Sequence, residues 1–203
     1  MKLYYTPGAC SLSVHIALNE MAIPASFESV DLKTKKTETG ADFLKINPKG
    51  EVSTLLLDNG QILTENAVIL QYLADTYKKT DFLPPLGDFN RYRTLEWINF
   101  ITTDIHKGIG LMFNPDLPAD FRDKSQIPGI KKKFDLVDQH LATHKFIMGD
   151  HFTLPDAYLF VMLLWLGNFK IELSNWKNIP DYFARIKARP AVQKTLHEEG
   201  LDK

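Results

Sequence analysis

The chain has 203 residues, which is enough for one large domain or two small ones. Its 24 Lys and Arg against 25 Asp and Glu leave a formal net charge of −1, which argues against a domain that binds nucleic acid through bulk positive charge. With 44% hydrophobic and 24% charged residues, the composition is that of a folded globular protein and not of a disordered chain.

The first part of the chain alternates between strand and helix signals. An aromatic-rich run at residues 2–5 stops at a Thr-Pro-Gly turn, which predicts a strand. The spacing of apolar residues over 11–21 predicts a helix that Pro24 closes. Residues 27–32 predict a second strand, and residues 41–44 predict a short helix. The expected order is therefore strand, helix, strand, helix.

A hairpin is predicted next. The Asn-Gly pair at 59–60 separates two apolar runs, 54–57 and 61–63, and Asn-Gly in this position is a strong hairpin signal. Apolar residues at helical spacing over 64–77 predict the helix that follows. Residues 78–87 carry two Pro and a Gly without periodicity, so we expect a linker and a domain boundary there.

Every signal beyond this linker is helical. The helix that begins at Pro155 has the clearest start, because Thr153 and Asp156 form a capping box with Asp in place of Glu. Pro near the start of several of these segments does no harm, because the first N–H groups of a helix have no partner within the helix. The predicted helices are 90–113, 127–141, 155–166, 180–187 and 191–199.

These patterns predict a two-domain fold of the α/β plus all-α kind. The order βαβαββα matches a thioredoxin-like N-terminal domain, and an all-α domain follows it. We expect the domains at residues 1–80 and 88–203, with a linker at 81–87.

Several functions find no support in the sequence. His140 and His144 have i, i+4 spacing but no HExxH-like carboxylate, so we expect no metal site. The N-terminus does not resemble a secretory signal, and no stretch approaches the roughly 20 apolar residues of a membrane span. We therefore expect a cytoplasmic protein that binds neither membranes nor nucleic acid.

The only cysteine, Cys10, lies where a thiolate is favoured. It follows a Pro-Gly turn at the start of the 11–21 helix, where free N–H groups and the helix dipole favour an anion and lower a thiol pKa. A small buried hydrophobe is the alternative role. Tyr5 and Ser11 flank it with hydroxyls that could donate to a thiolate, although a core aromatic and a helix cap explain them equally. A chain with one cysteine can form no intrachain disulfide, dithiol couple or multi-cysteine metal site.

Two further places carry weaker signals. Glu65 and Asn66 start the helix after the hairpin, where backbone N–H groups can bind a carboxylate and Glu can meet an ammonium. Such residues also start helices with no ligand. Asn99 and His106 are seven residues apart, which is about two turns of the predicted 90–113 helix. A His beside a thiol can move a proton near neutral pH, although an ordinary polar helix residue is the alternative.

Four separated motifs resemble the bacterial beta class of cytosolic glutathione transferases. They are YYTPGACS, NPKGEV, LTENAVILQYLAD and EWINFITTDIHKG, and they follow the order and spacing of that family over essentially the whole chain. The segment FTLPDAYLF resembles the capping-box segment of the family. The resemblance implies a thioredoxin-like domain, an all-α domain, a homodimer, no cofactor, and a glutathione co-substrate bound mainly by the N-terminal domain.

The resemblance also implies roles for single residues. Cys10 would contact the glutathione sulfur and could form a mixed disulfide with it, and Lys35 would pair with the glycine carboxylate. The main chain of Val52 would hold the cysteinyl backbone, while Glu65 and Asn66 would take the γ-glutamyl end. The residues expected to close the site from the helical domain are Asn99, Thr103, Asp104, Ile105 and His106. His106 and Lys107 would lie near the sulfur and the acceptor pocket. The catalytic candidates are Cys10, His106, Tyr5 and Ser11.

Two positions depart from the usual pattern of this family. A cis Pro usually follows the Val, whereas this chain has Ser53. Because a cis bond before a non-proline costs roughly 2.5 to 4 kcal/mol, we expect a trans Val52-Ser53 bond and a rearranged loop. Asn66 stands where Ser is usual, and its amide still offers both a donor and an acceptor.

The sequence supports two classes of function. In the first, the protein adds glutathione to small apolar electrophiles, and Cys10 could also support glutathione-dependent thiol exchange. The alternative is a non-catalytic module that keeps the fold and binds an apolar ligand or a protein. The residues expected to line the acceptor pocket indicate only that it is apolar: Ile109, Leu111, Met112, Phe113 and Trp165.

Overall fold

The structure is a computed structural model that describes residues 1–202, and it divides into two compact units. The first unit is Met1–Leu83 together with the segment from Ala188 onward, and the second is Pro84–Lys187. The division after Leu83 lies inside the segment expected to be a linker. The C-terminal end differs from the sequence expectation, because the last helix belongs to the first unit.

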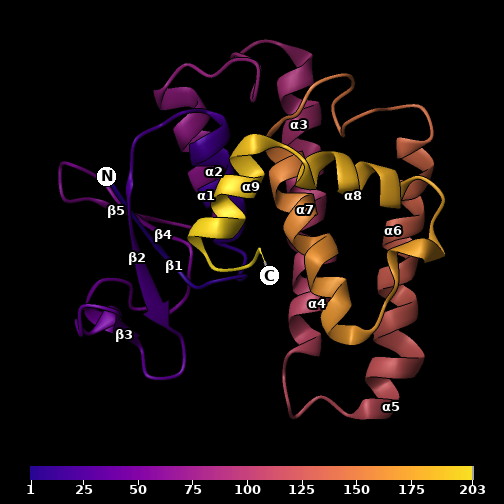
Figure 1. The fold of residues 1–203 in the computed structure, drawn as a ribbon, viewed down its shortest axis with the longest axis horizontal. Helices are drawn as coiled ribbons and strands as arrows, with labels where there is room; N and C mark the ends of the chain where they lie inside the picture. Colours follow the sequence, from indigo (N-terminus) through magenta and orange to yellow (C-terminus); the bar gives the residue numbers. More distant parts are fainter. Residues whose placement is uncertain (203) are drawn as a thin grey trace. The chain divides into compact units, whose positions relative to one another are not determined.

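The first unit contains a mixed five-stranded sheet in the order β3-β2-β1-β4-β5 (Figure 1). Strand β1 runs parallel to β2 and antiparallel to β4, and the outer pairs are antiparallel. The strands are β1 (Lys2–Tyr5), β2 (Ser26–Asp31), β3 (Lys36–Thr37), β4 (Thr54–Leu56) and β5 (Ile62–Thr64). This order places β1 at the centre, directly before the turn that leads to Cys10.

The central strand is covered on both faces. Leu3 and Tyr4 are neighbours in β1, so their side chains point to opposite faces, and both are buried. Tyr4 packs in a buried cluster with Val30 and Phe43. Leu3 lies opposite Leu55 of β4 in the sheet register, and both are fully buried. Because both faces of β1 are buried, apolar and aromatic residues occupy consecutive positions in this strand and do not alternate with polar ones.

Three helices of the first unit agree with the predicted order: α1 (Leu12–Glu20), the short 3-10 helix η1 (Phe43–Lys45) and α2 (Asn66–Thr76). The fourth, α9 (Pro190–Glu198), was expected in the helical domain. The hairpin between β4 and β5 is confirmed, with Gly60 in the left-handed region at a φ of 82°. Strand β3 was not predicted, because two residues in a Lys- and Thr-rich stretch show no alternation. With β3 added, the expected α/β fold is confirmed.

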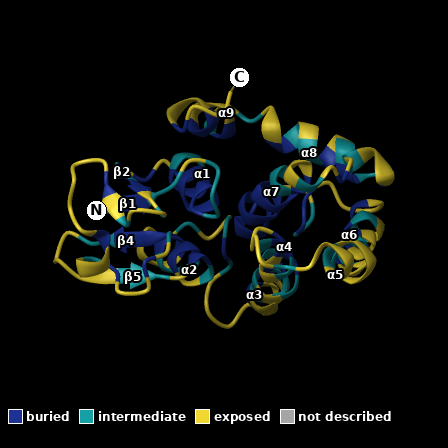
Figure 2. Cartoon of the chain, turned by 90° about the horizontal axis from the view of Figure 1, so that it is seen from below, coloured by how far each residue is buried: buried dark blue, intermediate teal, exposed yellow. Residues whose placement is uncertain are grey.

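Helix α9 lies beside α1, although about 170 residues of sequence separate them (Figures 1 and 2). Nε and Nη2 of the Arg189 guanidinium each donate to one carboxylate oxygen of Glu20, at 2.5 and 2.8 Å. At the other end of α1, the two ring nitrogens of buried His15 each lie 2.9 Å from a carboxylate, one of Glu198 and one of Glu199. These ion pairs and hydrogen bonds explain why the C-terminal segment belongs to the first unit.

The second unit is entirely helical in its regular structure. Its helices are α3 (Phe89–Phe100), the π-helix η2 (Ile101–His106), α4 (Lys107–Met112), α5 (Ala119–Phe121), the π-helix η3 (Arg122–Gln126), α6 (Ile127–Leu141), α7 (Leu154–Leu166), the 3-10 helices η4 (Gly167–Phe169) and η5 (Leu173–Asn175), and α8 (Ile179–Lys187). Helix α7 is buried along most of its length, and other helices of the unit surround it (Figure 2). The predicted all-α domain is therefore confirmed.

Two of the predicted helices have a different internal form. The segment expected as one helix at 90–113 is continuous but contains the π-helix η2 at its middle. The expected helix 127–141 matches α6, but α5 and η3 extend it backward to Ala119. Pro128 lies in the first turn of α6 directly after the π-helix η3, so it stands inside a continuous helical segment and does not mark its start.

The capping box of α7 is confirmed. One carboxylate oxygen of Asp156 accepts from the backbone N–H and the hydroxyl of Thr153, at 2.8 and 2.9 Å. The other oxygen accepts from the Ile147 N–H at 2.9 Å and from the Tyr182 hydroxyl at 2.8 Å. The fully buried carboxylate therefore joins the start of α7 to the loop before it and to α8.

Candidate functional site

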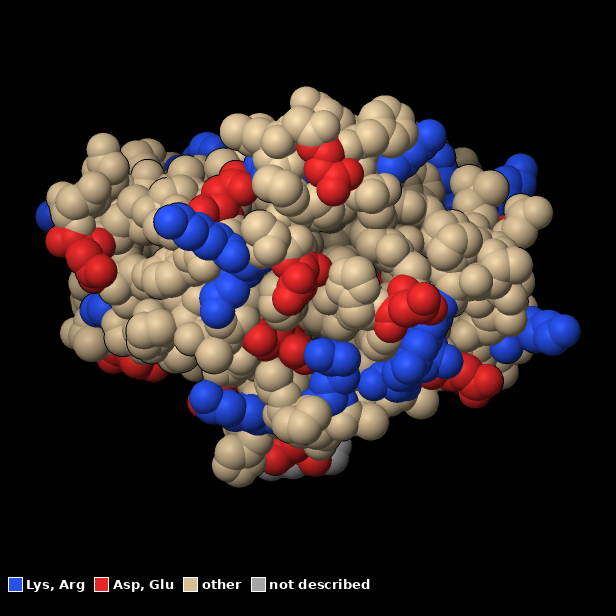
Figure 3. Space-filling view, turned by 90° about the horizontal axis from the view of Figure 1, so that it is seen from above, with Lys and Arg blue, Asp and Glu red and all other residues tan. Residues whose placement is uncertain are grey.

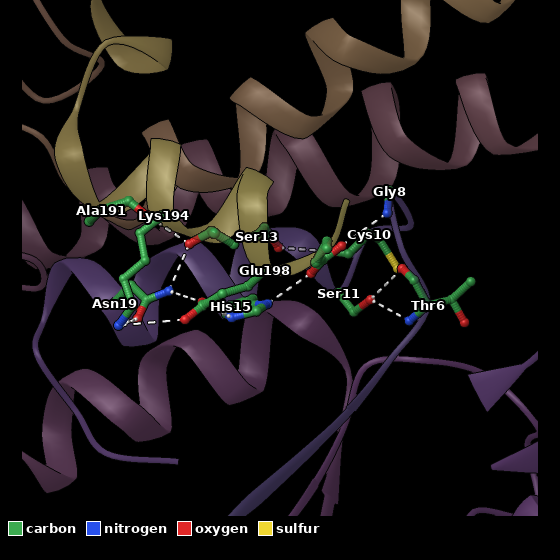
Figure 4. Close-up of polar contacts among 12 residues, drawn as sticks. Thr6, Gly8, Cys10, Ser11, Ser13, His15, Asn19, Ala191, Lys194 and Glu198 are labelled. Atoms are coloured by element: carbon green, nitrogen blue, oxygen red, sulfur yellow. Dashed lines mark hydrogen bonds and ion pairs between the residues drawn. The ribbon is translucent and has the colours of Figure 1, made fainter. Parts of the chain in front are cut away.

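A tight turn between β1 and α1 presents Cys10 at the start of the helix. Gly8 has a φ of 71°, which only glycine adopts easily, and its N–H donates to the Glu199 carboxylate at 3.0 Å. The Thr6 N–H donates to the Ser11 hydroxyl at 3.2 Å, and both residues appear in Figure 4. These hydrogen bonds hold the backbone before Cys10, at Thr6 and Gly8, and the side chain after it, at Ser11.

The Cys10 sulfur lies against the main chain of a second loop. Cys10 is half-buried, and its thiol donates to the carbonyl oxygen of Val52 at 3.2 Å. Burial raises the pKa of the Cys10 thiol to about 11, although the N–H groups of Cys10 and Ser11 and the side chain of Asn66 act in the opposite direction. The expected lowering of the Cys10 pKa is therefore wrong. Loss of water around the sulfur outweighs the helix-start effect.

The Val52-Ser53 peptide bond is cis, so the expected trans bond is wrong. The expectation rested on the intrinsic cost of a cis bond, which the surrounding fold can override. Ser53 is buried, and its hydroxyl donates to the Asn66 side chain. The loop is also held by Asn47, whose amide donates to the Glu51 carbonyl at 2.8 Å and to the Thr54 hydroxyl at 2.9 Å.

The two residues expected to take the γ-glutamyl end differ in their surroundings. Glu65 is exposed, has a φ of 74°, and pairs with the ammonium of Lys49. Asn66 is buried, and its amide donates to the Cys10 carbonyl at 2.7 Å and to the Ser13 hydroxyl at 3.2 Å. Sequence reasoning assigned no role to Lys49, although it lies inside the NPKGEV motif. A direct contact of Glu65 or Asn66 with glutathione stays a prediction.

The remaining candidates of the first unit have structural contacts of their own. The Lys35 ammonium donates to the Gly50 carbonyl at 2.7 Å. Tyr5 makes edge contacts with the rings of His15 and Phe27, at 5.9 and 6.5 Å between centroids, and burial raises its pKa. The Ser11 hydroxyl, fully buried, bonds within the Thr6 turn. The ring contacts of Tyr5 agree with its alternative role as a core aromatic, whereas Ser11 lies at the N-cap of α1 but its side chain makes no capping hydrogen bond.

The candidates of the second unit lie in and around the π-helix η2. A π-helix has more residues per turn than an α-helix. The spacing of about two turns that was expected between Asn99 and His106 therefore does not hold across η2. Among these candidates, Ile105 is fully buried, whereas Asn99, Thr103 and Lys107 are exposed. π-helical turns occur frequently at functional sites, but the low burial of most of these side chains does not by itself assign a ligand.

Two polar candidates of this segment, His106 and Asp104, bond side chains of other helices in the second unit. The ring Nδ1 of His106 lies 2.6 Å from the hydroxyl of buried Tyr158 on α7. The Asp104 carboxylate accepts from the Lys133 ammonium at 2.6 Å, and this bond lowers the Asp104 pKa. Sequence reasoning missed Tyr158, because its spacing in an apolar helix predicts only a core residue.

The side chains expected to line an acceptor pocket fall into two groups. Ile109 and Met112 are buried in the core of the second unit, whereas Leu111 and Phe113 are partly exposed. The Phe113 ring contacts Trp165 at 5.2 Å between centroids. Rings at one end of α7 thus form an aromatic cluster whose members are His106, Phe113, Trp165 and Phe169.

The structure also bears on metal and surface sites. Within residues 1–202, no group of three or more His, Cys, Asp and Glu side chains is placed to hold a metal ion. His140 and His144 stack at 4.0 Å, and each bonds a backbone carbonyl. No helix in the described part of the chain is long and apolar enough to cross a membrane. Acidic and basic side chains are interspersed on the face seen in Figure 3.

Comparison with known proteins identifies relatives of both units. The family model "Glutathione S-transferase, N-terminal domain" matches residues 8–76, and the model "Glutathione S-transferase, C-terminal domain" matches residues 100–190. The chain is 42% identical to glutathione S-transferase GstA of Escherichia coli O157:H7 over 201 residues, which cover 99% of this chain and all of the relative.

Solved structures give the same result. A sphingomonad glutathione S-transferase complexed with glutathione matches with a TM-score of 0.94 and 38% identity, covering 99% of this chain and all of the other. A bacterial beta class glutathione S-transferase from Sphingomonas chungbukensis matches with a TM-score of 0.94, 39% identity and the same coverage.

Proposed function

Because the chain belongs to the glutathione S-transferase family, a family of transferases, we propose that it adds glutathione to small apolar electrophiles. The observation that carries the proposal is the position of Cys10. Its thiol lies beside the Val52 carbonyl at the start of α1, where the resemblance expects the glutathione sulfur. The relative complexed with glutathione supports the same co-substrate here.

The raised pKa of Cys10 defines its role in this reaction. A thiol with a pKa of about 11 is a thiolate in roughly one molecule in ten thousand at pH 7. Cys10 therefore stays a thiol and serves as a hydrogen-bond donor. We propose that this donor turns to the glutathione sulfur and stabilises its thiolate, which then attacks the electrophile. Binding both reactants in one site adds to the rate by proximity.

Thiol exchange is a slower activity in this proposal. With a mixed disulfide between glutathione and another small thiol as the oxidised substrate, the Cys10 thiolate attacks the glutathione sulfur, a Cys10–glutathione disulfide forms, and the other thiol leaves as a thiolate that takes up a proton. A second glutathione thiolate attacks this disulfide at the glutathione sulfur, which restores the Cys10 thiolate and releases glutathione disulfide. Since the first step needs the Cys10 thiolate, exchange is expected to be much slower than conjugation at pH 7.

The other contacts of glutathione follow the resemblance. We propose that Lys35 pairs with the glycine carboxylate and that the main chain of Val52 holds the cysteinyl backbone. Glu65, which is exposed and pairs with Lys49, would meet the γ-glutamyl ammonium. The roles of the residues from Asn99 to Lys107 rest on the resemblance alone.

A homodimer in the cytoplasm is part of the same proposal. It is supported by the family and by apolar side chains that are exposed near the start of α3, including Leu86, Phe89 and Tyr92. Light scattering should give twice the chain mass of 23.2 kDa. A monomer at micromolar concentration would contradict this part of the proposal.

Two measurements test the function. Calorimetric titration with glutathione should give binding at or below millimolar concentration, and an activated aryl chloride should be conjugated at a rate that depends on both substrates. Cys10→Ala should slow conjugation by at least tenfold, and Lys124→Ala, which changes an exposed residue of the second unit, should leave it unchanged. Absence of both binding and turnover would favour the non-catalytic module.

A further inference from the structure

The two residues that depart from the usual pattern, Ser53 and Asn66, contact each other. They are 13 residues apart in the chain, and both are buried, with exposed fractions of 4% and 6%. The Ser53 hydroxyl donates to Oδ1 of Asn66. The departures are therefore one structural unit and not two independent changes.

The Ser53 bond sets the orientation of the Asn66 amide. Since Oδ1 accepts from Ser53, the amide nitrogen faces the start of α1. There it donates to the Cys10 carbonyl at 2.7 Å and to the hydroxyl of fully buried Ser13 at 3.2 Å. Ser13 donates in turn to the same carbonyl at 2.7 Å. An amide flipped by 180° would place Oδ1 against the Cys10 carbonyl, where both groups are acceptors, and would lose the bond to that carbonyl.

The contacts close a ring around the cysteine. The Cys10 thiol donates to the Val52 carbonyl at 3.2 Å, and Val52 is bonded covalently to Ser53. Ser53 contacts Asn66, and Asn66 returns to the Cys10 carbonyl. The sulfur, the Val52 main chain, Ser53 and Asn66 are therefore members of one closed set of contacts.

We propose that Asn66 is a positioning residue for Cys10 and that Ser53 orients its amide, so that the pair acts on the substrate through Cys10. The inference rests on the proposed function only in taking Cys10 as the residue that meets glutathione. It differs from the direct role that the resemblance implies, because both polar atoms of the Asn66 side chain already bond protein groups.

The titration of Cys10 is consistent with this geometry. Burial raises the pKa of the thiol, and the Asn66 side chain is one of the groups that lower it. An amide N–H turned toward Cys10 places the positive end of a dipole near the sulfur, which favours the thiolate. Loss of that donor should therefore make Cys10 less acidic.

The test measures the rate at which iodoacetamide alkylates the protein, because Cys10 is the only cysteine. Rates are taken between pH 8 and pH 10 without glutathione. Asn66→Asp, which removes the donor and adds a negative charge, should slow alkylation at least tenfold at each pH. Asn66→Ala should slow it about fivefold and Ser53→Ala about threefold. Asn66→Ser, which keeps a donor, should stay within about twofold of the wild type.

Coupling distinguishes the proposal from two independent effects. Once Asn66 is Ala, the Ser53 hydroxyl has no amide to orient, so Ser53→Ala/Asn66→Ala should react no more slowly than Asn66→Ala. Asn59→Asp introduces the same charge on an exposed turn and should leave the rate unchanged. Circular dichroism before and after labelling confirms that each variant is folded. If Asn66→Asp does not fold, the alkylation rates of Ser53→Ala, Asn66→Ala and the double variant are sufficient to test the proposal.

Two results would overturn the inference: an alkylation rate for Asn66→Asp within twofold of the wild type, or a double variant whose slowing equals the product of the single effects. Calorimetric titration of the same samples with glutathione distinguishes failure of this inference from failure of the proposed function. A wild type that binds no glutathione would contradict the function and leave the alkylation result intact. Variants that lose glutathione binding but keep the wild-type alkylation rate would show that Asn66 binds the ligand directly.

Discussion

Helices α1 and α7 are both almost wholly buried, and they differ in the side chains that they bury. In α1 every residue from Leu12 to Leu18 is buried, and this stretch includes Ser13 and His15. In α7 the buried residues after the first turn are nearly all apolar, and the charged Asp156 lies at its start. A buried polar group needs a partner, whereas an apolar side chain needs only close packing.

This difference makes the helix that carries Cys10 dependent on distant parts of the chain. The partners of Ser13 and His15 are Asn66 at the start of α2 and two carboxylates at the end of α9. Figure 4 shows this side of α1, with His15 and Asn19 turned toward Glu198 and Lys194. The comparison predicts that the C-terminal segment stabilises the cysteine site, and that α7 is stabilised by apolar packing together with the buried polar contacts of its first turn.

The largest effect is expected at the first turn of α7. Asp156→Ala removes the acceptor of four hydrogen bonds and leaves buried donors unpaired, which should cost about 3 to 5 kcal/mol. Equilibrium unfolding in urea measures the loss. Asp181→Ala, at an exposed position in the first turn of α8, is the matched control and should cost less than about 1 kcal/mol. Equal losses of unfolding free energy for the two variants would show that the hydrogen bonds of Asp156 stabilise the fold no more than an exposed carboxylate in a first turn does.

The next effect tests the dependence of α1 on the C-terminal segment. Glu199→Ala removes the carboxylate that bonds Nδ1 of the buried His15 ring and that accepts from the Gly8 N–H, so we expect a loss of about 2 to 4 kcal/mol. Glu198 also bonds His15, but its side chain is 34% exposed, and Glu198→Ala should cost about 1 kcal/mol or less. Urea unfolding of both variants checks the ratio. A larger loss of unfolding free energy for Glu198→Ala than for Glu199→Ala would show that burial does not determine how strongly each contact with His15 stabilises the fold.

A pH-dependent effect follows from Glu28 in β2. Burial alone would raise its pKa, but bonds from Lys2 and Thr39 outweigh it and hold the pKa at about 2. Because the folded pKa lies below the unfolded value of 4.5, the stabilisation is present above about pH 5 and is lost as the pH falls toward 2. The loss should reach about 2 to 3 kcal/mol. Glu28→Gln should flatten the stability profile between pH 5 and pH 2, and an unchanged slope would contradict the assignment.

The smallest effect on stability is expected at the hydroxyl of Tyr158. Tyr158→Phe keeps the ring in the core of α7 and removes the bond to Nδ1 of His106, which should cost about 1 kcal/mol. If His106 takes part in turnover, the same change should alter kcat more than KM. Steady-state kinetics across pH 6 to 9 tests this expectation. Phe160→Leu, also in the core of α7, serves as a control that alters packing without touching His106.

Local sequence signals predicted much of the fold. The Asn-Gly turn located the β4–β5 hairpin, and Thr153 and Asp156 located the start of α7, because both signals act within a few residues. Strand β3 and the π-helix η2 were missed, since two paired residues leave no periodicity and a π-turn has the same composition as an α-helix. The motif that contains Cys10 also identified the candidate site.

The sequence by itself determined most of the order of the elements, the family and the residue types at the candidate site, because these depend on local propensity and on motifs. Only the tertiary structure decided the direction of the Cys10 pKa, the cis bond before Ser53, the partners of Asn66 and the unit to which α9 belongs. Each of these depends on burial or on a contact between residues far apart in the chain. The free energy of removing a group from water, and of pairing it with a remote partner, is a property of the packed structure and not of the local sequence.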